Sequence, residues 1–69
     1  MPIDPNIEPI EILRMALERE RAAHAFYKEA AAVVKHPAAK STLLDMAAEE
    51  EEHIRRLEEA LDRNFYADN

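Results

Sequence analysis

The sequence predicts an all-α fold, in which two helices form an antiparallel hairpin and the hairpin pairs with a second chain into a four-helix bundle. Glycine is absent, and the helix-forming residues Ala, Glu, Leu and Arg dominate. The four prolines stand at positions 2, 5, 9 and 37, outside two long proline-free stretches. A chain of 69 residues also buries too little of its own surface for more than a marginal core, so we expect a partner.

The prolines set the helix ends. Pro9 is acceptable in the first turn of a helix. His36 precedes Pro37 and is therefore biased away from helical geometry, whereas Pro37 can itself begin a second helix. Such a short connection forces the two helices to run antiparallel. The predicted parts are an extended segment 1–8, a hairpin 9–63 with helices at about 9–35 and 37–63, and a C-terminal tail 64–69.

Composition excludes several function classes. Nine Lys and Arg against fifteen Asp and Glu give a net charge of -6, which repels phosphate backbones and anionic membranes, so we expect no nucleic-acid partner. The chain lacks cysteine, which excludes disulfides, thiol nucleophiles and Cys-ligated metals. The longest apolar run, Ala30 to Val34, is far below the ~20 residues of a membrane span, and the N-terminus lacks a signal-peptide pattern. We expect a soluble, cytoplasmic protein.

Each predicted helix carries a core stripe with spacings of three and four residues. Polar residues interrupt both stripes: Glu20 and His24 in the first, and Glu50 in the second, with His53 on its adjoining edge. A carboxylate on a buried stripe is costly unless it is paired or binds a cation. The stripes are Ile10, Leu13, Leu17, Glu20, His24, Tyr27, Ala31 and Val34, then Leu43, Ala47, Glu50, Ile54, Leu57 and Leu61.

Three of these polar residues fall in one layer of the hairpin. Counted from residue 36, Glu20 lies 16 residues before the turn, Glu50 lies 14 after it and His53 lies 17 after it. At ~1.5 Å per residue, their heights agree to within about 5 Å. Glu50 and His53, three residues apart, also share one helix face. Two carboxylates and an imidazole are half of a di-iron carboxylate site, so a dimer would complete it.

The remaining glutamates of "EEEEH" are assigned from the same register. Glu51 and Glu52 are expected to face water, whereas Glu49 is ambiguous and is kept as a neighbour of the site. His24 is either an additional ligand or a hydrogen-bond donor beside the ligands or, about twice as readily, a hydrogen-bonded core histidine. For Tyr27, a role beside the site as a hydrogen-bonding partner or redox participant is as well supported as a place in the ordinary core.

The segment "ERAAHAFYKEAAAVVKHPAAKSTLLDMAAEEEEHIRRLEEAL" resembles the ferritin-like rubrerythrin group. Its single hairpin and the interval from Glu20 to Glu50 are most similar to the encapsulated ferritins. The resemblance implies that Glu20, Glu50 and His53 bind iron and catalyse its oxidation, with Tyr27 beside them. In family members acidic residues commonly flank the first ligand, whereas Arg19 and Arg21 flank Glu20 here.

The resemblance further implies a function. The implied function is that of a ferroxidase in iron storage or detoxification. Such an enzyme oxidises Fe(II) to Fe(III) at a di-iron centre shared between two subunits. The partner would be a second copy, in a homodimer or a larger even-numbered homo-oligomer, and the product iron would be stored inside a separate encapsulin nanocompartment. Carboxylates and imidazole also suit Zn or Mn, and Ca is a further substitute.

Two other classes stay open. The chain could be a non-catalytic helical hairpin that dimerises through its apolar stripe, with the polar layer fixing the register as single polar residues do in coiled coils. A third, narrower option is a structural zinc or calcium ion at the same position. Replacement of both stripe glutamates by leucine tests these readings: if they only set the register, the assembly should become more stable with no effect on metal, whereas if they are ligands, iron binding and oxidation should vanish.

Overall fold

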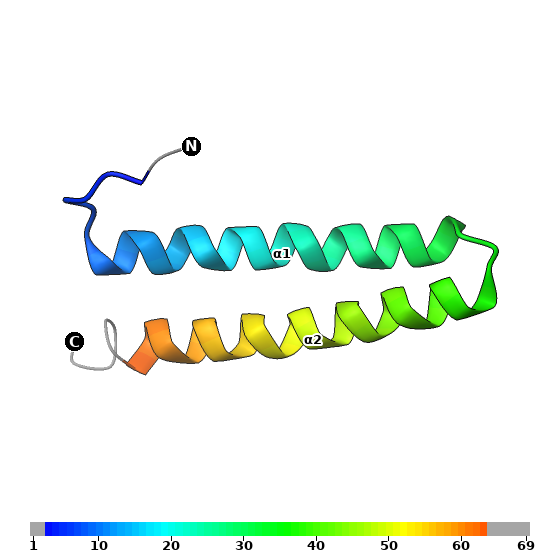
Figure 1. Ribbon diagram of the computed structural model, residues 1–69. Coiled ribbons are helices and arrows are strands. Elements are labelled where there is room, and N and C mark those ends of the chain that lie inside the picture. The colour runs from blue at the N-terminus through cyan, green and yellow to red at the C-terminus, as the bar shows by residue number, and fades with distance from the viewer. Residues whose placement is uncertain (1–2, 64–69) are drawn as a thin grey trace.

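The structure is a computed structural model that describes residues 3–63. It consists of two α-helices of equal length, α1 (Pro9–Val33) and α2 (Pro37–Leu61), which run antiparallel and side by side. The chain enters α1 and leaves α2 at the same end of the hairpin (Figure 1). The predicted all-α hairpin is therefore confirmed. Neither helix has an apolar stretch long enough to cross a membrane.

Proline begins both helices, as the sequence indicates. Pro9 and Pro37 stand in the first turn, where a missing N–H costs nothing. The ring Nδ1 of His36 accepts a hydrogen bond from the backbone N–H of Ala39 at 3.2 Å, which caps α2. Helix α1 ends at Val33, and Val34 has an extended backbone with φ -72° and ψ 142°. The observed helices thus end at residues 33 and 61, each two residues before the expected position.

The core between the helices is small. Among the described residues, four apolar side chains are buried: Leu17, Ala31, Ala47 and Leu61. All four belong to the two predicted stripes, and the other stripe residues are partly exposed. Because full burial of a leucine contributes about 1.5–3 kcal/mol and alanine far less, this core alone leaves the hairpin marginally stable.

The hairpin has two different faces. Successive residues are about 100° apart around a helix, so Glu20 and Arg21 lie on opposite flanks of the contact line, as do Glu50 and Glu51. The flank with Glu20 and Glu50, here called the front face, also carries partly exposed apolar side chains. The opposite flank, the back face, carries ion pairs between the helices. The front-face apolar residues are Leu13, Tyr27, Leu43, Met46 and Leu57.

Candidate metal centre

Three side chains converge halfway along the hairpin. Glu20 projects from α1, and Glu50 and His53 project from α2. One ligand atom from each of the three lies within 4.8 Å of the other two. The Nδ1 atom of His53 is 3.2 Å from Oε2 of Glu20 and 3.7 Å from Oε2 of Glu50. The layer predicted by counting from the turn is therefore present in the structure.

The local structure explains why these side chains meet. Residues three apart on a helix lie one turn above each other, so Glu50 and His53 leave α2 on the same side. The antiparallel course of the chain then brings Glu20 of α1 to the same height. All three stand in the interior of 25-residue helices, where the backbone is held by its own hydrogen bonds. The donors are thus on rigid elements.

Glu50 is the residue whose environment most requires a cation. Its side chain is only 16% exposed, against 30% for Glu20 and 49% for His53. Its Oε2 atom is buried and has no hydrogen-bond partner. A buried acceptor without a donor costs about 1–3 kcal/mol, and more when it is charged. A divalent cation between the two carboxylates would remove this cost.

The donor set fits a transition-metal ion. Carboxylate oxygens with an imidazole nitrogen suit divalent iron, manganese and zinc. One hairpin supplies three donors, which is half of the four glutamates and two histidines of a di-iron carboxylate bundle. His53, half-exposed at the front face, gives the cluster an open side toward solvent. The arrangement can therefore offer a metal ion three donors from one chain.

The other predicted site residues have different surroundings. His24 turns to the back face, where its Nε2 atom lies 3.1 Å from Oε1 of Glu51. Glu49 is exposed. Tyr27 is partly buried on the front face, and its ring contacts that of Phe26 edge-on, with centroids 5.6 Å apart.

The glutamates of the acidic run before His53 therefore have different partners. Glu50 faces the cluster, Glu51 pairs with His24, and Glu52 forms hydrogen bonds with Arg55 at 2.6 and 3.2 Å. The hydrogen bond from Arg55 lowers the pKa of the Glu52 carboxyl from its ordinary value. Glu51 and Glu52 do lie at the surface, but the sequence reasoning missed their partners.

A signal for the His24 pair was present in the sequence. His24 lies 12 residues before position 36 and Glu51 lies 15 after it, so their heights differ by about 4.5 Å at 1.5 Å per residue. The same count places Glu49 and Glu50, 13 and 14 residues after position 36, still nearer in height to His24, so it allows the pair with Glu51 without selecting it. The count could not show which flank of the contact line His24 takes.

Comparison with known families decides the classification. The family model described as Rubrerythrin matches residues 11–69, most of the chain. The chain belongs to the rubrerythrin family. Domains of this family are ferritin-like di-metal carboxylate domains that bind di-iron, and the family includes oxidoreductases and ferroxidases. No curated protein and no solved structure matches the chain significantly.

Proposed function

We propose that this chain is a ferroxidase, which oxidises Fe(II) to Fe(III) at a site formed by two copies of the hairpin. The observation that carries the proposal is the buried, unpartnered Oε2 atom of Glu50 within the cluster of Glu20, Glu50 and His53. Membership of the rubrerythrin family supports iron among the cations that these donors suit.

The position of the cluster supports a shared site. Helix α1 is centred on residue 21 and α2 on residue 49, so Glu20 and Glu50 each lie one residue from the middle of their helix. A two-fold axis through this layer, perpendicular to the helices, would bring the clusters of the two copies face to face. The helices of the two copies would then be in contact along their full length. The front-face apolar residues would be buried by the same contact. One geometry then completes both the core and the donor set.

The residues divide the work of the reaction. Glu20 and Glu50 supply negative charge at the cations, and the neutral imidazole of His53 supplies a nitrogen donor. Two Fe(II) ions, the substrate, each lose one electron, and dioxygen takes up the two electrons with two protons to form hydrogen peroxide. The protein provides no nucleophile. Its contribution is to hold both metal ions on rigid helices at a fixed separation.

We assign the activity to iron storage or detoxification. The support is the resemblance of residues 20–61 to the encapsulated ferritins, which hand oxidised iron to a surrounding encapsulin shell. Placement inside such a compartment rests on that resemblance.

Native mass spectrometry before and after anaerobic addition of Fe(II) tests the site. We expect about one iron per chain, bound only in assemblies with an even number of chains. The Glu50→Ala variant should lose the iron, whereas Glu52→Ala, two positions along the same acidic run and paired with Arg55, should retain it. Iron bound equally by both variants would contradict the assignment.

A second function is favoured by the hydrogen bond between His53 and Glu20. Since these side chains satisfy each other in part, the layer could fix the register of a structural dimer, with or without a zinc or calcium ion. The Glu20→Leu/Glu50→Leu double variant separates the two functions. Both functions predict a more stable assembly in this variant, so the effect on metal separates them: a register layer predicts none. A structural ion predicts tight binding by the wild-type protein without oxygen consumption.

A further inference from the structure

Helix α1 carries an exposed apolar surface that the metal centre does not use. Met15, Phe26 and Val33 are 39%, 63% and 73% exposed. At 100° per residue, these three side chains lie more than 130° around the helix from the buried Ala31, so they point away from α2. We call this side of α1 the outer edge. Its residues are Ile12, Met15, Arg19, Ala22, Phe26, Glu29 and Val33.

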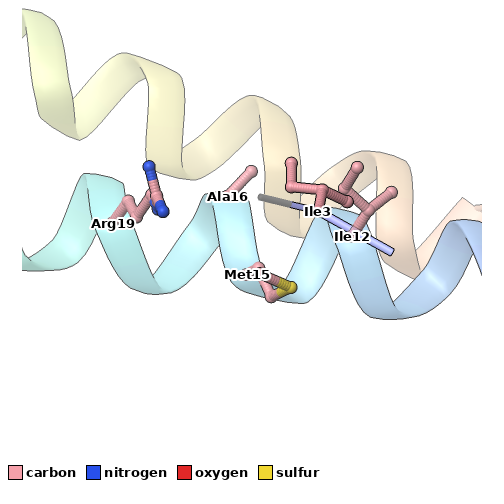
Figure 2. A pocket seen from close by; sticks show the side chains of 5 residues that line it. All are labelled: Ile3, Ile12, Met15, Ala16 and Arg19. Atoms are coloured by element: carbon pink, nitrogen blue, oxygen red, sulfur yellow. The ribbon is translucent and has the colours of Figure 1, made fainter. Parts of the chain in front are cut away.

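Two hollows on the outer edge are built alike. One, of about 130 Å³, is lined by Ile12, Met15, Ala16 and Arg19 together with Ile3 (Figure 2). The other, of about 290 Å³, is lined by Phe26, Glu29, Ala30 and Val33. Within α1, both sets have the spacing i, i+3, i+4, i+7, and they are offset by two heptads. Four residues with this spacing form the hole that receives a side chain of a facing helix in a coiled coil.

The outer edge is complementary to itself when two copies run antiparallel. If Met15 is placed opposite Val33 of a second copy, Arg19 falls opposite Glu29 and Phe26 falls opposite the small Ala22. Apolar side chains then meet apolar side chains, the large Phe26 meets a small residue, and each charge meets its opposite. Within residues 3–63, neither Arg19 nor Glu29 has an ion-pair partner. A parallel arrangement would instead place like charges together.

We propose that the outer edge of α1 is a second two-fold contact between copies of this chain, formed by antiparallel packing of α1 on α1. This contact is separate from the front face and does not depend on the metal centre. A chain with two different two-fold contacts links more than two copies into one assembly. The same pairing explains why Arg19 stands beside Glu20, since it belongs to this interface.

Charge reversal tests the antiparallel pairing. We expect Arg19→Glu and Glu29→Arg each to reduce the mass of the assembly in native mass spectrometry at least twofold. Each substitution places two like charges opposite each other at two symmetric points of the contact. The double variant Arg19→Glu/Glu29→Arg should restore the wild-type mass. Lys40→Glu, an exposed reversal on α2, is the matched control and should change nothing. Masses that do not respond to the single reversals, or a double variant that stays small, would overturn the proposal.

An apolar pair of variants gives a second, independent measurement. Phe26→Ser should reduce the assembly as Arg19→Glu does, whereas Leu44→Ser, at an exposed leucine of α2, should not. Circular dichroism confirms that each variant remains helical. Iron binding by Glu29→Arg, nine residues from Glu20, distinguishes this contact from the ferroxidase site. Iron retained per chain in a smaller assembly supports the outer edge as a separate interface, and an equal loss of mass in Leu44→Ser would contradict it.

Discussion

The two faces of the hairpin differ in how their charged side chains are arranged. On the back face, Arg21 and Glu58 pair at 2.8 Å, and His24 lies 3.1 Å from Glu51. On the front face, Glu20 and Glu50 lie together beside His53, and a buried oxygen of Glu50 has no donor. The back face thus pairs these charges within one chain. The front face leaves this oxygen without a donor, which is the deficit that the proposed cation and second copy would remove.

Different burial explains why charged groups on the two faces contribute differently to the free energy of unfolding. Arg21 and Glu58 are each about half-exposed, and exposed ion pairs contribute only about 0–1 kcal/mol. Glu50 is 16% exposed and its Oε2 atom has no hydrogen-bond donor, so the charge of this carboxylate is far more costly. Removal of a front-face carboxylate should therefore change metal binding and stability strongly, whereas removal of a back-face charge should change little.

The largest expected effect comes from replacing both front-face carboxylates. In the Glu20→Leu/Glu50→Leu variant, we expect iron-dependent oxygen consumption to fall at least 100-fold, because the charged donors are gone. The melting temperature without metal should rise, since two like charges leave a partly buried site. Oxygen-electrode assays and thermal denaturation measure the two quantities. Retained oxidation in this variant would rule out the site.

Alanine variants of the two histidines, one on each face, sharpen the comparison. His53→Ala should weaken Fe(II) binding about 10–100-fold, because it removes the nitrogen donor. His24→Ala should leave binding within about twofold, because His24 faces Glu51 instead. Isothermal titration under anaerobic conditions gives both constants. If His24→Ala proved the more damaging of the two, the assignment of the faces would have to be exchanged.

A back-face substitution should affect stability only slightly. Arg21→Ala removes the pair with Glu58 and should lower the free energy of unfolding by less than about 1 kcal/mol. Urea denaturation monitored by circular dichroism measures this change. The rate of iron oxidation should stay at the wild-type value, and a loss of oxidation in this variant would show that the faces are coupled.

The smallest expected effect concerns the surface pair of Glu52 and Arg55. The hydrogen bond from Arg55 lowers the pKa of the Glu52 carboxyl below 4.5. A lowered pKa in the folded state means that the pair stabilises above the unfolded pKa and that this stabilisation is lost as pH falls through the folded value. In Arg55→Ala, the Glu52 pKa should return toward 4.5 in an NMR titration. An unchanged value would disprove the pairing.

The sequence predicts the hairpin and the site layer because both depend on counting. Prolines 9 and 37 begin the helices, and distances from the turn bring Glu20, Glu50 and His53 to one height. The flank taken by His24 was not predictable, because that residue lies near the contact line and side-chain direction there depends on the packing of both helices. The proposed pairing with a second chain stays a prediction, because it depends on contacts between copies.

Oxygen stoichiometry tests the central claim most directly. The wild-type protein, loaded anaerobically with two Fe(II) per pair of chains, is mixed with oxygenated buffer while oxygen, hydrogen peroxide and Fe(III) are followed. The account predicts rapid uptake of one dioxygen per two Fe(II), with release of one hydrogen peroxide, and loss of this rapid phase in Glu50→Ala. Oxidation at the rate of free Fe(II) in buffer, equal in both proteins, would contradict it.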